Sequence, residues 1–222
     1  MKLFTYINYF YFLLDNWDFK IAWYMIRQEL RGERKYGINS TGVDELMKLE
    51  ELGIDISHAT IYMPASYSLL EEIFRHLISA PKKHFLDMGC GKGRALCMAA
   101  HYGYSKLTGI DIAKELCEIA KENLALTKQK ITYIEYTIIN NDAFYFEIPG
   151  DVDCIFLFNP FDEIIMSGVV ENILTGYQNH QRMITVIYVN PLYKELFLNA
   201  GFRQTRHFKK MKYIEAVILE LE

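Results

Sequence analysis

A glycine-rich turn between a short apolar run and a helical pattern most constrains how this chain can fold. Residues 84–94 read HFLDMGCGKGR, and an apolar helical pattern follows over 95–100. Glycines leave the backbone free to take positive φ and carry no Cβ to block a ligand. The amides at a helix start favour an anion or a polar ligand group. The sequence therefore predicts a strand, a loop and a helix, with a nucleotide-like ligand at the carboxyl end of a parallel strand.

The spacing of the glycines separates two kinds of nucleotide site. A dinucleotide fingerprint is Gly-x-Gly-x-x-Gly, whereas here the third glycine, Gly93, comes one residue early. The run Asp87-x-Gly89-x-Gly91-x-Gly93 instead resembles the first motif of class I S-adenosylmethionine (SAM)-dependent methyltransferases. In that family the loop, which here includes Cys90, wraps the amino-acid end of SAM.

Strand and helix patterns alternate after this loop. The expected strands cover 106–110, 131–139, 152–158, 183–189, 202–208 and 212–220, and the expected helices cover 114–126, 164–175 and 192–200. Only a short turn joins the last two strands, so they should form an antiparallel hairpin. This order resembles that of the class I methyltransferases. The resemblance covers residues 61–222 and implies an α/β fold, a seven-stranded doubly wound Rossmann-like sheet with an antiparallel C-terminal hairpin.

Residues 1–60 form a separate N-terminal helical segment in this interpretation, ahead of a methyltransferase domain over 61–222. Residues 1–35 are helical and unusually aromatic, with Asn16 as the cap of the second helix. The apolar run 3–14 is too short to span a bilayer. We expect it to pack on the core or on a partner rather than to anchor the chain at a membrane surface.

Composition and charge indicate which partners the chain can bind and in which cell compartment it is expected. Apolar residues make up 51% of the chain and charged residues 23%, which suits a globular protein with a sizeable core. The net charge of −4 gives no global basic field for nucleic acid or membrane. The four cysteines form no CxxC pair and no metal-ligand spacing, so we expect reduced thiols, a cytoplasmic location and no metal. The oligomeric state is left open.

Two acidic residues at strand ends are candidates for holding the nucleoside of SAM. Asp111, followed by Ile112, ends the second strand, where a carboxylate can accept hydrogen bonds from both ribose hydroxyls. The family resemblance implies that role for Asp111, and it implies that Asp142 and Ala143, after the third strand, bind adenine. Tyr62 precedes the loop by about the distance at which related enzymes fold a segment over SAM. It either helps to close the site or is an ordinary packed tyrosine.

The run Asn159-Pro160-Phe161 follows the apolar fourth strand. It resembles the Asn/Asp-Pro-Pro-Tyr/Phe motif of methyltransferases that modify planar or amine nitrogens, with one proline in place of two. In those enzymes the Asn side chain and a proline carbonyl accept hydrogen bonds from the target N–H groups, and the aromatic ring packs on the substrate. The GxGKGR and FNPF runs together resemble a little-characterised bacterial family, distantly similar to the non-SET histone-lysine methyltransferases.

Lys92 and Arg94 place two cations near a helix N-terminus, where positive charge is unfavourable. We therefore expect an acidic partner, which could be Asp87, a nearby glutamate or the carboxylate of SAM.

Together these features indicate a SAM-dependent methyltransferase that acts on a nitrogen of an unidentified acceptor: a protein, a nucleic acid or a small molecule. No residue stands out as a general base, so Asn159 would orient the acceptor rather than deprotonate it. Two alternatives remain. One is a non-catalytic interaction module that binds SAM or a nucleoside. The other is a nicotinamide-dependent oxidoreductase, which the glycine spacing disfavours.

Overall fold

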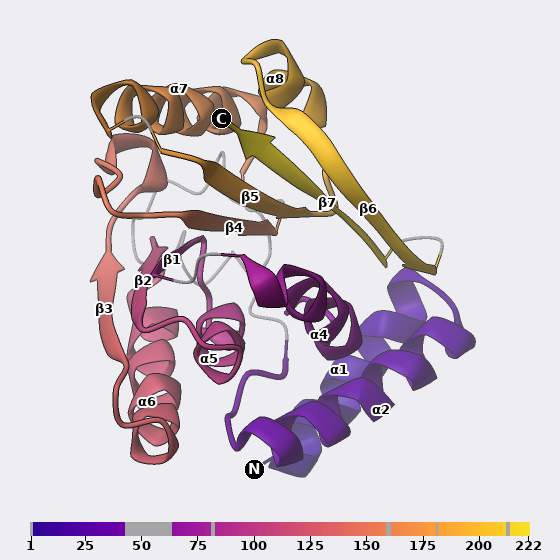
Figure 1. Cartoon of the computed structure of the whole chain (residues 1–222). Coiled ribbons are helices and arrows are strands. Elements are labelled where there is room, and N and C mark those ends of the chain that lie inside the picture. The colour runs from indigo at the N-terminus through magenta and orange to yellow at the C-terminus, as the bar shows by residue number, and fades with distance from the viewer. Residues whose placement is uncertain (1, 43–63, 81–82, 159–160, 181, 212–213) are drawn as a thin grey trace.

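Seven strands form one sheet at the centre of the molecule (Figure 1). The computed structural model describes residues 2–42, 64–80, 83–158, 161–180, 182–211 and 214–222. The sheet has the order β3-β2-β1-β4-β5-β7-β6. Its strands are β1 (His84–Met88), β2 (Lys106–Asp111), β3 (Glu135–Asn140), β4 (Cys154–Phe158), β5 (Ile184–Val189), β6 (Arg203–Met211) and β7 (Ile214–Leu221).

Strand directions confirm the expected topology. β1 pairs in parallel with both β2 and β4, and the pairs β2–β3 and β4–β5 are also parallel. β7 runs antiparallel to β5 and to β6, so the C-terminal hairpin completes the sheet. The strand order reverses between β1 and β4, and open α/β sheets bind ligands in the crevice at such a point, outside the carboxyl ends of the strands.

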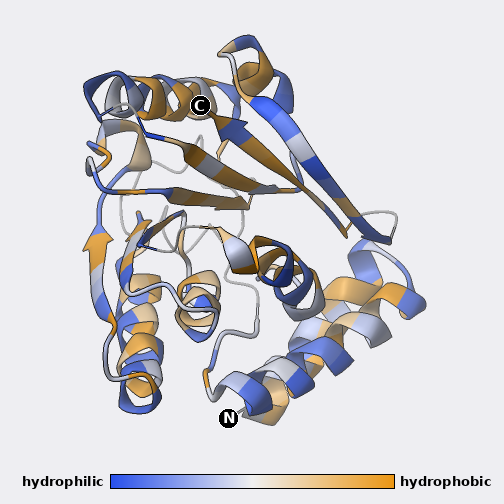
Figure 2. Ribbon diagram, viewed as in Figure 1, coloured by the Kyte–Doolittle hydropathy of each residue, from blue (hydrophilic) through white to orange (hydrophobic). Residues whose placement is uncertain are grey.

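Helices cover both faces of the sheet, and each face has its own apolar core. α4, α5 and α6 pack on one face, and α7 and α8 pack on the other (Figure 1). Figure 2 shows the inner strands β4, β5 and β7 as apolar, and the outer strand β6 as mainly hydrophilic. The helices are α1 (Lys2–Asn16), α2 (Phe19–Tyr36), α4 (Tyr67–His76), α5 (Arg94–His101), α6 (Lys114–Lys130), α7 (Glu163–His180) and α8 (Lys194–Asn199), with 3₁₀ turns η1 (Leu77–Ser79) and η2 (Ala143–Tyr145).

Several element boundaries differ from the expectation; α7, for example, continues to His180 and β6 to Met211. The second helix is capped by Asp18, whose carboxylate accepts a hydrogen bond from the Ile21 amide at 2.8 Å, and not by Asn16, which ends α1. The third strand begins at Glu135 and not at residue 131, because α6 continues through Lys130 and the chain then turns over residues 131–133. Residues 127–130 are mostly good helix formers, so the helix extends until the backbone turns at Ile131.

The N-terminal helices pack on the rest of the chain, as expected. α1 and α2 form an antiparallel pair around an apolar cluster, and α2 also packs against α4. None of the helices in the described part of the chain is long and apolar enough to cross a membrane. The predicted domain boundary at 60/61 falls on residues 43–63, which lie outside the described residues.

Gly32 shows how closely α2 packs on α4. A Cβ at this position would lie 2.2 Å from ring carbons of Tyr67, whose ring stacks on Tyr36. Alanine favours a helix over glycine by about 1 kcal/mol, yet Gly32→Ala should lower the free energy of unfolding by roughly 1–3 kcal/mol, because the ring cannot move without repacking. The matched control is Gly176→Ala in α7, where the nearest atom lies at 3.8 Å. Thermal unfolding should separate the two variants, and equal midpoints would contradict this packing.

Candidate functional site

The glycine loop joins β1 to α5 and folds back onto β2. The amides of Gly89 and Cys90 donate to the Ile110 carbonyl at 2.9 and 2.8 Å. Gly89, Gly91 and Gly93 have φ values of 82°, 51° and 75°, which other residues rarely adopt. The predicted positions therefore need glycine for backbone reasons. Hydrogen bonds within the chain hold the loop in place before any ligand binds.

Asp111 lies at the carboxyl end of β2, in contact with this loop. One carboxylate oxygen accepts a hydrogen bond from the Gly91 amide at 2.7 Å, and the other accepts one from the Ala113 amide at 2.9 Å. Each carboxylate oxygen has about two lone-pair sites, so both can accept a further hydrogen bond from a ligand. Burial raises the pKa of Asp111, and the two amides oppose this shift.

Asp87 is the most unusual polar group in this region. Its side chain is buried on β1, and its Oδ1 has no hydrogen-bond partner among the described residues. Burial raises the pKa of Asp87 well above its ordinary value, and the charge of Asp111 raises it further. Orphaned buried carboxylate oxygens are costly, and two neighbouring acidic groups repel each other. A ligand that brings positive charge to this edge of the sheet would relieve both effects.

The predicted site residues that follow the third strand, β3, lie at the same edge of the sheet as Asp111. The Asn140 side-chain amide donates to the carbonyls of Asp111 and Ile112, at 3.0 and 2.7 Å, and so ties the end of β3 to the end of β2. Asp142 accepts a hydrogen bond from the Phe144 amide at 2.8 Å and caps η2, while Ala143 is buried. In this structure Asp142 thus caps η2. Its predicted contact with adenine stays a prediction.

Three other predicted site residues, Tyr62, Asn159 and Pro160, lie outside the described residues. Phe161 is partly buried and packs against the core between the sheet and α7. β4 pairs in register with β1, with Leu157 opposite Met88. The chain that leaves β4 therefore starts directly beside the glycine loop.

Arg94 has an acidic partner that comes from the N-terminal helices. Its guanidinium donates to both carboxylate oxygens of Glu29 on α2, with Nη1 to Oε1 at 2.8 Å. The side chains of Glu29 and Arg94 are 0% and 4% exposed, so the pair is fully desolvated. The guanidinium also lies 4.0 Å from the centre of the Tyr67 ring. Of the partners considered from the sequence, a glutamate is correct for Arg94.

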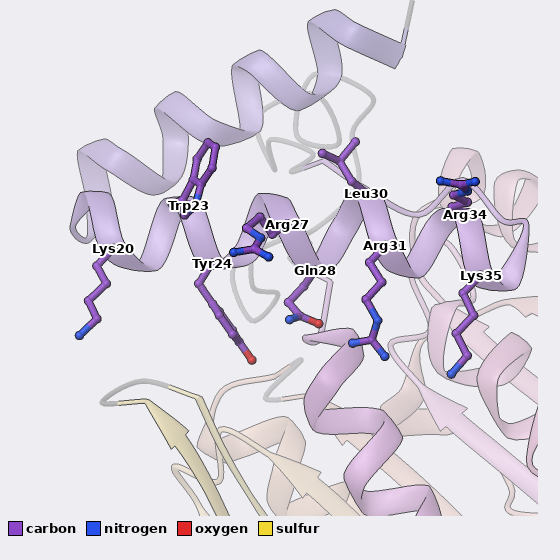
Figure 3. Close-up of a pocket in the computed structure, with 9 residues that line it drawn as sticks. All are labelled: Lys20, Trp23, Tyr24, Arg27, Gln28, Leu30, Arg31, Arg34 and Lys35. Carbon is purple, nitrogen blue, oxygen red and sulfur yellow. The ribbon is translucent and has the colours of Figure 1, made fainter.

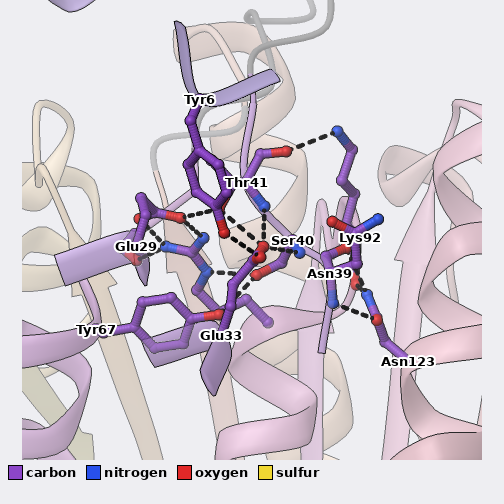
Figure 4. A network of polar contacts seen from close by, with 11 residues as sticks. Tyr6, Glu29, Glu33, Asn39, Ser40, Thr41, Tyr67, Lys92 and Asn123 are labelled. Atoms are coloured by element: carbon purple, nitrogen blue, oxygen red, sulfur yellow. Dashed lines mark hydrogen bonds and ion pairs between the residues drawn. The ribbon is translucent and has the colours of Figure 1, made fainter. Parts of the chain in front are cut away.

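Further hydrogen bonds tie the chain after α2 to the glycine loop (Figure 4). Glu33 accepts from the backbone amides of Ser40 and Thr41 at 2.8 and 2.9 Å. Lys92 donates to the Thr41 carbonyl at 3.3 Å, and the Asn123 amide donates to the Lys92 carbonyl at 2.8 Å. Glu33, Ser40, Thr41 and Asn123 were not predicted from the sequence, where the signal for such contacts was the pair of cations, Lys92 and Arg94, beside a helix start.

Comparison with known proteins agrees with this geometry. Residues 85–177, from β1 into α7, match the methyltransferase-domain family. Over these residues the chain is therefore similar to a methyltransferase domain. A candidate protein N5-glutamine methyltransferase from Methanocaldococcus jannaschii is 32% identical over 115 residues, which are 51% of this chain and 54% of that protein. The chain thus spans about half the length of this curated relative.

Solved structures of low sequence identity share the fold of this chain. The magnesium protoporphyrin IX methyltransferase of Synechocystis, crystallised with SAM, has 16% identity and a TM-score of 0.52 over 69% of this chain and 77% of that one. A SAM-dependent methyltransferase from Aquifex aeolicus has 16% identity and a TM-score of 0.52 over 80% of this chain and 98% of that one.

The residues at the sheet edge fit SAM as the cofactor. SAM carries a sulfonium and an ammonium group, which suit an edge where a buried oxygen of Asp87 has no partner in the part of the chain that the structure describes. Its ribose offers two hydroxyl donors to the oxygens of Asp111. The loop glycines leave room for close approach of the backbone to a ligand.

Proposed function

We propose that the whole protein is an enzyme that transfers the methyl group of SAM to a nitrogen atom of an acceptor. The observation that carries this proposal is the buried oxygen of Asp87 beside the glycine loop, which has no hydrogen-bond partner among the described residues, on the edge where Asp111 also lies. An acidic, preorganised edge of this kind suits a cationic nucleoside better than a dinucleotide pyrophosphate.

Each predicted residue has a proposed role toward the cofactor. The loop residues Gly89, Cys90, Gly91 and Gly93 surround its amino-acid end together with Asp87. Asp111, flanked by Ile112, accepts from the ribose hydroxyls. Asp142 accepts from the adenine amine while Ala143 packs on the ring. Tyr62 belongs to the segment that closes over the site.

The transfer step requires orientation and exclusion of water more than proton transfer. Bound SAM supplies an electrophilic methyl group on a sulfonium. Asn159 and the Pro160 carbonyl accept hydrogen bonds from the acceptor N–H groups, which aims the nitrogen lone pair at the methyl carbon. Phe161 packs on the acceptor. An amine acceptor must arrive neutral, because no general base is assigned.

The acceptor we favour is the side-chain amide nitrogen of glutamine in a protein. The supporting observation is the name of the relative from Methanocaldococcus jannaschii, which describes a protein N5-glutamine methyltransferase. A lysine amine is the second candidate, through the distant resemblance to non-SET histone-lysine methyltransferases. The cell compartment we propose is the cytoplasm, because the four cysteines are buried free thiols and thiols persist in reducing compartments.

The proposed activity is tested by radiolabelled methyl transfer from SAM into fractionated cell extract. Mass spectrometry of the labelled product then assigns the modified atom. A methylated glutamine supports the favoured acceptor, a methylated lysine replaces it with the second candidate, and a methylated oxygen or carbon contradicts nitrogen transfer. A thermal-shift comparison of SAM with NAD tests cofactor choice separately, and stabilisation by NAD alone would overturn the proposal.

Asp111→Ala should weaken SAM binding by roughly 10-fold to 100-fold, because hydrogen bonds to a charged acceptor contribute about 1.5–3 kcal/mol each. Asp111 also holds the loop through Gly91, so affinity for SAM alone cannot separate the two effects. Calorimetry should therefore compare S-adenosylhomocysteine with its 2′-deoxy analogue on both proteins. The wild-type chain should lose affinity for the deoxy analogue, and Asp111→Ala should bind the two ligands equally. An unchanged preference in the variant would mean that the ribose lies elsewhere.

A further inference from the structure

The outer surface of the α1–α2 hairpin carries large apolar side chains that are exposed to solvent. Leu3 and Phe4 on α1 are 70% and 73% exposed, and Ile7 and Tyr11 on the same face are also exposed. These positions are three, four or eight residues apart, so they form one stripe along α1. The opposite side of α1 is the one that packs on α2, through Tyr9 and Leu13.

The apolar stripe of α1 continues onto α2. Phe19, Trp23 and Leu30 are exposed, and the rings of Phe19 and Trp23 are stacked with their centres 6.4 Å apart. Phe10 of α1 contacts Phe19 edge-on at 6.1 Å, and it also contacts Tyr11. The aromatic side chains of the two helices are thus joined into a single apolar face.

A row of cations borders this apolar face. Lys20, Arg27 and Arg34 are spaced by seven residues, so they lie along one line of α2, next to the line of Phe19, Trp23 and Leu30. Figure 3 shows Trp23 and Leu30 on one side of α2 and Lys20 on the other. Together with neighbouring side chains of α2 they line a groove of about 1060 Å³, whose residues are Lys20, Trp23, Tyr24, Arg27, Gln28, Leu30, Arg31, Arg34 and Lys35.

The positive charge of this surface is not neutralised within the described part of the chain. The two acidic residues of α2, Glu29 and Glu33, are buried and face inward. Glu71 pairs with Arg31 and Lys35. Among the described residues, Lys20, Arg27 and Arg34 have no carboxylate partner, although the whole chain has a net charge of −4.

We propose, against the expectation from the sequence alone, that the α1–α2 hairpin is a binding surface for an anionic lipid bilayer. A row of cations beside exposed aromatic and aliphatic side chains suits a helix pair that lies in the headgroup region, with the apolar face inserted and the cations at the lipid phosphates. Aliphatic Leu3, Ile7 and Leu30 favour lipid over single-stranded nucleic acid, which is bound by cations and stacked aromatics. A second copy of this chain is a less suitable partner, because a two-fold contact through α2 would place the cation row of one copy against the cation row of the other, where like charges repel. The hairpin would lie on the bilayer and would not span it.

The test uses the full chain and sedimentation with vesicles. The protein should partition onto vesicles of phosphatidylcholine mixed with phosphatidylglycerol, and much less onto phosphatidylcholine alone. Lys20→Ala with Arg27→Ala should weaken this binding roughly 25-fold, and Phe4→Ser should weaken it about 10-fold to 100-fold. Both tryptophans of the chain, Trp17 and Trp23, belong to the hairpin, so their emission should shift to shorter wavelength on binding.

Matched controls remove two exposed cations and one exposed apolar side chain on other faces. Lys114→Ala with Lys121→Ala on α6, and Ile164→Ser on α7, alter exposed side chains outside the hairpin and should leave vesicle binding unchanged. Absence of binding to anionic vesicles, or equal loss in the controls, would overturn the proposal. Two other results would also overturn it. One is a solution dimer that Phe4→Ser converts to monomer. The other is tighter binding to polyuridylate than to vesicles, with sensitivity to Lys20 and Arg27 but not to Phe4.

Discussion

Asn159→Ala should lower the rate of methyl transfer by about 10²–10³-fold while SAM affinity stays within a few fold. Loss of one oriented polar contact to the reacting group typically has an effect of this size. The residue follows β4, which pairs with β1 beside the glycine loop and away from the β2 and β3 ends that carry Asp111 and Asp142. We therefore expect its amide near the methyl end of the cofactor and not near the ribose or adenine.

The measurement needs single-turnover kinetics on the identified acceptor, with SAM binding by calorimetry on the same preparation. Asn159→Asp is the matched variant, because a carboxylate accepts the same hydrogen bond and the related motif contains Asp at this position. It should keep more activity than Asn159→Ala. Near-normal turnover by Asn159→Ala would remove the Asn-Pro-Phe run from the mechanism and leave the proposed SAM contacts standing.

Glu29→Gln should destabilise the protein by about 3–5 kcal/mol, the usual effect of breaking a buried ion pair by removing one partner. The substitution keeps the shape of the side chain but removes the carboxylate with which the buried guanidinium of Arg94 pairs. Because Arg94 begins α5 directly after Gly93, the glycine loop should also loosen, and SAM affinity should fall with stability. Urea unfolding and calorimetry measure the two effects.

Two controls distinguish the effect of losing the Glu29–Arg94 ion pair from general destabilisation of the N-terminal helices. Glu118→Gln removes the partner of Lys121 on the surface of α6 and should change stability little, since exposed pairs contribute little. The double variant Glu29→Leu with Arg94→Met replaces the ion pair by apolar side chains and should recover much of the lost stability. If Glu29→Gln unfolds at the same urea concentration as the wild-type chain, the N-terminal helices do not hold the loop through this pair.

Local patterns in the sequence were sufficient to predict most of the fold. Apolar runs of strand length, helical periodicity and glycine stops depend on neighbouring residues, and they gave the alternation that the seven-stranded sheet confirms. The errors were at boundaries. Asp18, not Asn16, caps α2, and α6 extends to Lys130, since the choice between adjacent capping residues depends on where the chain turns in space.

The sequence also determined which polar residues follow which strands, and parallel strands bring their carboxyl ends to one edge. That is why Asp87, the glycine loop, Asp111 and Asp142 could be predicted as neighbours from their positions alone. Their roles toward SAM, and those of Tyr62 and the Asn159-Pro160-Phe161 run, remain predictions.

Only the tertiary structure decided the partner of Arg94, the orphaned oxygen of Asp87 and the outward face of α1. Arg94 and Glu29 are separated by 65 residues, and no local spacing relates them. The helix start at Arg94 required an anion nearby, but several glutamates met that requirement in the sequence. Burial and pairing depend on which surfaces meet after the chain has folded. The same reason explains why α1, apolar along most of its length, buries Tyr9 and Leu13 but leaves Leu3 and Phe4 at the surface.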